Sequence, residues 1–123
     1  MRYLSLYKSV ETGPPTPAEM ERMGALIQKW MADGALLGAE GCLPSVRGMR
    51  IRLSDGKITV TDGPFTESKE VIGGYAILQA QSKKEAIELT KRFLLIHGDE
   101  WEIECEVRQL EEPDLGTARN AAA

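Results

Sequence analysis

The chain has 123 residues, enough for one domain with a single hydrophobic core. Apolar residues make up 42% and charged residues 28% of it, which is typical of a globular protein, and no apolar stretch is long enough to cross a bilayer. The net charge of −4 argues against a nucleic-acid surface, which needs a basic face. The first residues lack the apolar segment of a secretory signal. We therefore expect a cytoplasmic protein that binds neither nucleic acid directly nor membranes.

The cysteine and histidine content argues against a structural metal. Cys42 and Cys105 lie far apart, and in a reducing cytoplasm two free buried thiols are a better interpretation than a disulfide. With His97 as the sole histidine, no typical zinc site can be composed, and no phosphate loop or nucleophile elbow is present. The sequence thus predicts no cofactor and no metal. A weak magnesium or calcium site from Asp62, Glu67 and Glu40 is the alternative left open.

The first third of the chain predicts a strand followed by a helix. Residues 2–7 alternate, with Leu4 and Leu6 on one face and tyrosine and serine side chains on the other. Thr16-Pro17-Ala18-Glu19 is typical of a helix start, with Thr16 and Glu19 forming a capping box. Gly34 is placed to end that helix in the left-handed conformation. The apolar stripe predicted for the helix consists of Met20, Met23, Ile27, Trp30 and Met31.

The middle of the chain predicts strands and a hairpin. A strand over 36–43 stops at Pro44, and two alternating segments flank Asp55-Gly56, a dipeptide typical of a hairpin turn. After the long connection 62–70, residues 71–80 predict another strand. Gly73-Gly74 within it indicates a bulge or a close approach of another backbone.

The last third predicts a second helix and a final strand. Ser82 to Glu85 form another capping box, and Gly98 is a plausible stop for the helix. The side chains predicted on its apolar side are Ala86, Leu89, Thr90 and Phe93. In the final strand Trp101, Ile103, Cys105 and Val107 alternate with Glu102, Glu104, Glu106 and Arg108. We expect one domain over 1–110 and a loosely ordered tail over 111–123.

The order of these elements predicts an α+β fold. Without the inserted hairpin it is βαβ-βαβ, the ferredoxin-like arrangement of an antiparallel sheet with both helices on one face. The other face carries charged residues of the last strand, which Arg50 and Arg52 could pair with across strands. A half-apolar, half-charged open face suits a second subunit, so the architecture predicts a homodimer that forms an α+β barrel.

The segment from Thr59 to Tyr75, with Asp62-Gly63-Pro64-Phe65 at its centre, resembles the DGPF signature of YCII-related (YciI-like) proteins. Gly38 to Ser45 and Glu106 to Gln109 are also similar to that family, and the resemblance extends to about Gln109. It implies a ferredoxin-like fold and a dimeric α+β barrel. Shorter YciI-type members carry a helix histidine proposed to act with an aspartate, but residues 17–33 here contain no histidine. DGPF-type proteins also tend to be encoded beside extracytoplasmic-function sigma factors, which implies a regulatory association.

Asp62 and His97 are the candidate catalytic residues. Asp62 precedes Gly63-Pro64, so its carboxylate either caps a turn, with Gly63 at positive φ, or serves as a base at a strand end. His97 follows the second helix, where it either stabilises the helix end or acts as a general acid–base. In both cases we favour the structural role.

Glu40, Glu67 and Lys69 are the candidate ligand-binding residues. Glu40 lies between small residues that leave room for a pocket, although it could instead pair with Arg50 or Arg52. Glu67 and Lys69 belong to the motif loop, where a solvated surface is the usual explanation.

Three functions remain open at this point. The first is a small-molecule-binding homodimer with acid/base enzymatic activity in a barrel cleft. The second is a non-catalytic regulatory or binding protein associated with an extracytoplasmic-function sigma factor. The third is a dimeric scaffold whose motif loop is purely structural.

Overall fold

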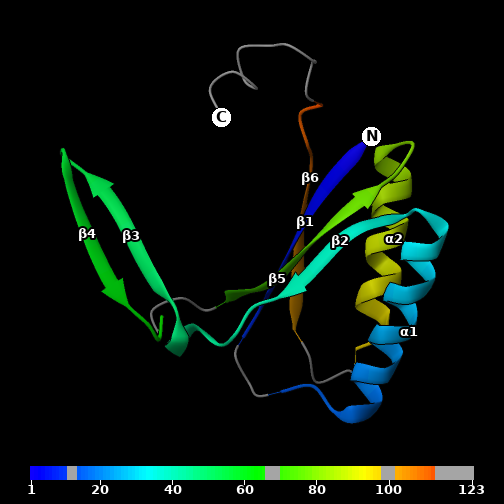
Figure 1. The fold of residues 1–123 in the computed structure, drawn as a ribbon, viewed down its shortest axis with the longest axis horizontal. Coiled ribbons are helices and arrows are strands. Elements are labelled where there is room, and N and C mark those ends of the chain that lie inside the picture. The colour runs from blue at the N-terminus through cyan, green and yellow to red at the C-terminus, as the bar shows by residue number, and fades with distance from the viewer. Residues whose placement is uncertain (11–13, 66–69, 98–101, 113–123) are drawn as a thin grey trace.

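The structure, a computed structural model, describes residues 1–10, 14–65, 70–97 and 102–112 (Figure 1). Its elements in chain order are β1 (Arg2–Ser9), α1 (Pro17–Asp33), β2 (Leu36–Gly41), the short 3-10 helix η1 (Ser45–Arg47), β3 (Met49–Ser54), β4 (Lys57–Asp62), β5 (Val71–Gln79), α2 (Lys83–Leu95) and β6 (Ile103–Gln109). No helix within these described ranges is long and apolar enough to span a membrane.

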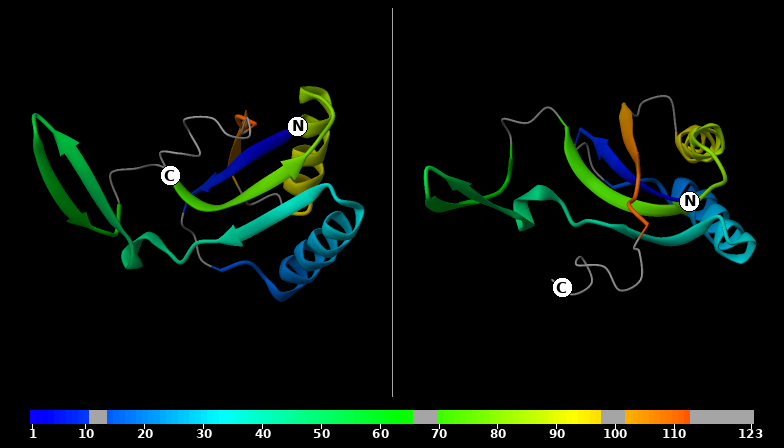
Figure 2. Two further views of the ribbon diagram at one scale, coloured as in Figure 1. Left: turned by 45° about the horizontal axis from the view of Figure 1, so that its top comes forward. Right: turned by 90° about the horizontal axis from the view of Figure 1, so that it is seen from above.

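Four of the strands form one antiparallel sheet in the order β2-β5-β1-β6. Figures 1 and 2 show α1 and α2 side by side against this sheet, and the buried core joins Trp30 of α1 and Leu89 of α2 to Tyr3 and Leu78 of the sheet. The predicted ferredoxin-like α+β fold is confirmed. Strands β3 and β4 pair only with each other and project away from the sheet (Figure 1).

Both helices begin where local chemistry predicts. Thr16 caps α1: its hydroxyl accepts from the Glu19 amide at 3.2 Å, while the Glu19 carboxylate accepts from the Thr16 amide at 3.2 Å. Gly34 ends α1 with φ of 80°. Ser82 caps α2 by accepting from the Glu85 amide at 3.2 Å, but the return bond of the predicted box is not formed.

The buried stripe of α1 differs from the predicted one. Met20 and Met31 are exposed, because they lie on the flank of the face that meets the sheet. Leu26 takes part instead, so that Met23, Leu26, Ile27 and Trp30 follow the i, i+3, i+4, i+7 spacing. On α2, the predicted side chains Ala86, Leu89, Thr90 and Phe93 are all buried or half-buried, which confirms that face.

The two faces of β1 have opposite characters. Tyr3 and Ser5 are buried on the helix side, where they pair with Leu78 and Ala76 of β5. Leu4 and Leu6 therefore point to the other side, which neither helix covers. We call this side of the four-stranded sheet the open face.

The glycine pair of β5 makes the bulge that the sequence predicts. Tyr7 pairs with Gly74 and Lys8 with Ile72, so that Gly73 has no partner on β1. The Gly73 carbonyl accepts from the Cys42 amide at 2.8 Å on the β2 side. A Cβ on Gly74 would lie 2.6 Å from the Glu40 carbonyl oxygen, so both glycines are needed for close packing.

The hairpin and the loop after it are held by η1. Asp55 and Gly56 both have positive φ, 52° and 76°, as the predicted turn requires. The Gly63 amide donates to the Gly48 carbonyl at 2.9 Å, and the Phe65 amide donates to the Ser45 hydroxyl at 3.3 Å.

Gly63 is required for a reason other than the predicted one. Its φ is not positive, and the Gly63–Pro64 peptide bond is cis. A Cβ there would collide with the Ser45 carbonyl. A glycine is thus needed at position 63 because the backbone there passes close to η1.

Two further expectations are wrong. Arg50 and Arg52 do not pair with the glutamates of β6 across strands, because β3 lies outside the main sheet. Arg50 lies over the Phe65 ring instead, at 4.0 Å from its centroid.

Both cysteines are free as predicted, but Cys42 is exposed, because β2 is an edge strand and ends before it.

The domain boundary at residue 110 remains a prediction. The described chain continues along β1 to Glu112, whose carboxylate accepts from the Arg2 amide at 3.0 Å. Residues 113–123, and with them most of the predicted tail, lie outside the described residues.

Candidate functional site

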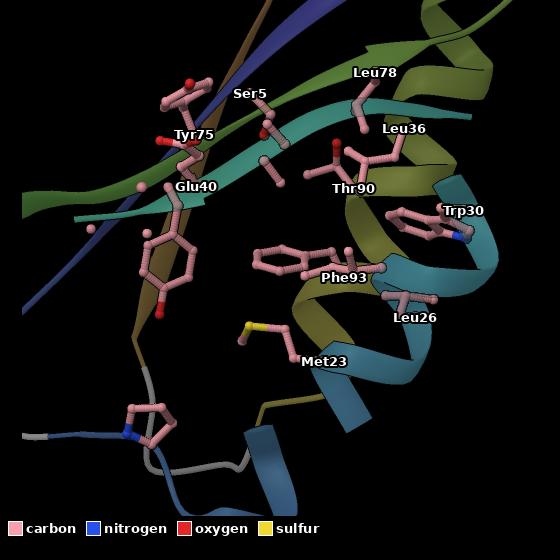
Figure 3. A pocket seen from close by; sticks show the side chains of 18 residues that line it. Ser5, Met23, Leu26, Trp30, Leu36, Glu40, Tyr75, Leu78, Thr90 and Phe93 are labelled. Carbon is pink, nitrogen blue, oxygen red and sulfur yellow. The ribbon is translucent and has the colours of Figure 1, made fainter. Parts of the chain in front are cut away.

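A cavity of about 350 Å³ lies between the sheet and the two helices. Figure 3 shows Met23, Leu26 and Trp30 from α1 and Phe93 from α2 turned toward the sheet across this space. Leu36 and Leu78 close it from the sheet side. The lining is predominantly apolar, and the volume is in the range of small-molecule sites.

Apart from Tyr75, which lines the cavity but whose ring is turned away, the lining residues with hydroxyl groups are Ser5, Tyr7 and Thr90. Thr90 donates to the Ala86 carbonyl at 2.9 Å within α2. Ser5 is buried on β1, near the Cys105 thiol of β6. Burial raises the pKa of that thiol, so Cys105 is not a reactive thiolate.

Tyr7 is a polar residue that lines the cavity. Burial raises the pKa of its phenol, and a hydrogen bond with the Ser9 side chain offsets part of that effect. The Glu19 carboxylate, and the Cys105 thiol once it ionises, also act to raise the pKa of Tyr7. Tyr7 therefore stays protonated at neutral pH and can both donate and accept a hydrogen bond.

His97 packs beside this tyrosine. Its ring centroid lies 5.8 Å from that of Tyr7 and 5.2 Å from that of Phe93, and Tyr7 and Phe93 themselves pack edge to face at 5.8 Å. The Nδ1 atom is 3.3 Å from the Leu94 carbonyl, which fits the expected helix-end role when Nδ1 carries the proton. His97 thus contacts two rings that line the cavity.

Glu40 lines the cavity, although its side chain belongs to the open face. It pairs with Tyr75, which pairs in turn with Leu6 on β1, so the three side chains share one side of the sheet. Figure 3 shows Tyr75 turned away from Phe93 and Met23. Within the described part of the chain, Glu40 forms no ion pair with Arg50 or Arg52.

Asp62 does not line this cavity. It is the last residue of β4, where it pairs with Met49 and is exposed. Figures 1 and 2 show the hairpin and α2, which His97 follows, well apart on the molecule. Asp62 and His97 are therefore not brought together within one chain, and their catalytic roles remain predictions.

Glu67 and Lys69 lie outside the described residues, so their predicted ligand contacts stay predictions. Among the residues that are described, no three His, Cys, Asp or Glu side chains cluster in a way that could hold a metal ion.

Reasoning from the sequence expected a pocket beside Glu40, which does line the cavity, but missed that the cavity lies between the sheet and the helices. Its polar members Ser5 and Tyr7 were visible as the polar face of the first strand, opposite Leu4 and Leu6. The face of a strand that helices cover is usually apolar, so polar and aromatic residues on that face are unusual. That alternation, rather than the motif loop, was the signal for the site.

Comparison with known proteins supports the family and leaves the activity open. An uncharacterized protein from Rhizobium meliloti (strain 1021) is 29% identical over 72 residues, a match that covers 58% of this chain and 58% of that protein. The chain thus spans less than two thirds of the length of this relative. The family model for the YCII-related domain matches residues 1–103. With most of its length matched, this chain belongs to the YCII-related domain family.

Proposed function

We propose that this chain is a homodimeric protein that binds a small, mostly apolar molecule in the cavity between its sheet and its helices. The observation that supports this most directly is the cavity of about 350 Å³ with a mostly apolar lining that includes the phenol of Tyr7. Sites of this kind bind through apolar contact and use a few polar groups to orient the ligand. An aromatic or short aliphatic molecule with a single hydrogen-bonding group has the required chemistry.

Two small probes test this binding proposal. Toluene and p-cresol differ by one hydroxyl, so both should shift the NMR signals of Trp30 and Phe93, and p-cresol should bind more tightly through Tyr7. Ala76 lines the cavity, so Ala76→Leu should abolish the shifts. Ala25 is exposed on α1, and Ala25→Leu is the matched control that should leave them intact. If neither probe shifts these signals in the wild type, the cavity is no binding site.

The open face supports the homodimer. Leu4, Leu6 and Ile77 are only half-buried there, and Ile72 is 52% exposed. An apolar sheet face without a cover is a common subunit interface. Sedimentation equilibrium at micromolar protein should give twice the chain mass of 13.6 kDa. A clean monomer would argue against this part of the proposal.

Acid–base catalysis is a second candidate, favoured by the contact of His97 with Tyr7 at 5.8 Å between ring centroids. The imidazole of His97 would exchange a proton with a ligand held beside Tyr7. Hydrolysis of p-nitrophenyl acetate by the wild type and by His97→Gln gives a first test. A rate above buffer that His97→Gln removes supports catalysis, and equal rates in both proteins argue for binding alone.

A further inference from the structure

The β3–β4 hairpin presents a continuous apolar surface to solvent. Every residue of both strands is exposed. Ile51 pairs with Val60 and Leu53 with Ile58, so these four side chains share one face of the hairpin with Met49. These five apolar side chains are between 59% and 71% exposed. We call the hairpin with this face the arm.

An arm of this kind is incomplete by itself. A two-stranded hairpin alone in water is marginally stable, and it becomes stable when its apolar face packs on something. In this chain the arm projects away from the four-stranded sheet (Figure 1), and its strands belong to no other sheet. Monomeric proteins rarely leave such a continuous apolar surface uncovered.

The open face of the sheet has the chemistry to cover the arm. Along β1 and β5 it carries an apolar stripe made of Leu4, Leu6, Ile72, Tyr75 and Ile77. Beside the stripe, β6 contributes Glu104 and Glu106, next to Lys8. Glu106 pairs with Lys8 at 2.9 Å and with Arg108, on the same face, at 2.7 Å, whereas Glu104 forms no ion pair among the described residues.

The cations of the arm have one carboxylate of β6 to meet, Glu104, because Glu106 already pairs with Lys8 and Arg108. Arg52 and Lys57 lie on the arm's polar face, opposite Thr59 and Ser54, and their long side chains can reach past the strand edges. Glu104 and Glu106 are matched in number by Lys8 and Arg108 on the same face, so the cations of the arm orient the contact through Glu104 rather than through a long-range attraction. The pairing of Arg52 with Glu104, which is not formed within one chain, becomes available between two chains.

We propose that the arm of each subunit crosses to the other subunit and packs its apolar face against the partner's open face. The proposal rests on the homodimer proposed above and names the surface that holds it. Each copy carries both the arm and the open face, so one two-fold axis satisfies both copies at once. A stable interface buries about 800 Å² per partner, and an arm of five apolar side chains supplies on the order of half of that area. The remaining area comes from the open faces themselves.

Sedimentation equilibrium of the full chain tests the arm with two variants on adjacent residues. Val60 lies on the apolar face and Thr59 on the polar face. The wild type and Thr59→Asp should be dimers, while Val60→Asp should dissociate at least tenfold more readily. If the wild type is dimeric and Val60→Asp dimerises equally well, the arm inference is wrong and the homodimer stands. If the wild type is monomeric, the homodimer itself is wrong, and the arm inference with it.

A second measurement uses the wild type alone, so that a folding defect in Val60→Asp cannot be mistaken for the loss of the interface. In dimers mixed from isotope-labelled and unlabelled chains, filtered NOE spectra report contacts between subunits only. We expect NOEs from the Ile51 and Ile58 methyl groups to the ring of the partner's Tyr75. A dimer whose arm methyl groups show no NOE to the other subunit would overturn the inference.

Discussion

The ring of Tyr7 lies against the backbone of Gly73, so closely that a Cβ on Gly73 would sit 2.8 Å from the ring atoms Cδ1 and Cε1. The bulge in β5 therefore positions the phenol of Tyr7, which lines the cavity. Substituting Gly73 must move either this ring or the strand. The glycine pair, from which the sequence predicted a bulge, thus affects both the geometry of β5 and the position of Tyr7 in the candidate site.

Gly73→Ala should destabilise the protein by about 1–3 kcal/mol, as expected when an extra methyl group is forced into a packed contact. Gly38→Ala is the matched control, because no atom lies within 4 Å of a Cβ at Gly38 in the neighbouring strand β2. Denaturant unfolding at fixed protein concentration measures both. Equal midpoints for the two variants would show that Tyr7 does not depend on the close approach.

The motif loop gives a contrast between two adjacent residues. Gly63→Ala should destabilise the loop strongly, because the new methyl group would collide with the Ser45 carbonyl. Asp62→Ala should change the stability by less than about 0.5 kcal/mol, since Asp62 is exposed and its carboxylate accepts no hydrogen bond from any described residue. Thermal unfolding and amide exchange at Gly48 measure the two effects.

The sequence alone favoured a turn-capping role for Asp62, with Ala clearly destabilising and Asn tolerated. A loss of about 1–3 kcal/mol in Asp62→Ala, with Asp62→Asn near wild type, would restore that interpretation. A neutral Asp62→Ala makes this carboxylate the first residue of the loop to test for ligand binding.

The raised pKa of Tyr7 predicts how stability responds to alkaline pH. The folded state holds this proton more tightly than the unfolded state, in which tyrosine titrates near its ordinary pKa of about 10. Its contribution to stability is therefore fully present below about pH 10 and is lost as the pH rises through the higher pKa of the folded state. The unfolding free energy of Tyr7→Phe should decline less steeply above about pH 10 than that of the wild type. Identical slopes would show that the phenol is not buried as described.

The cavity predicts an unusual response to a larger side chain. In a filled core, Ala→Leu costs about 1–3 kcal/mol through overpacking. At Ala76 the added carbons enter empty space lined by apolar groups, so Ala76→Leu should instead stabilise the protein by up to roughly 2 kcal/mol. Ala25→Leu, on the exposed side of α1, should change the stability by less than about 0.5 kcal/mol. A destabilised Ala76→Leu would mean that the space closes in solution.

Much of the fold was determined by short-range signals in the sequence. Thr16 and Glu19 satisfy each other's backbone amides within one helical turn, and Asp55-Gly56 closes the hairpin with two positive φ values. Such signals act between residues close together in the chain, so they can be recognised from the sequence without a structure. The alternation of the strands likewise defined two faces for each of them.

Only the tertiary structure decided what each face meets. Alternation separated Leu4 and Leu6 from Tyr3, Ser5 and Tyr7, but it could not tell which set the helices would cover. That choice depends on long-range packing, and it placed the polar set over the cavity and the leucines on the open face. The same long-range packing set the hairpin apart from the sheet, which separated Asp62 from His97 and left an apolar arm exposed.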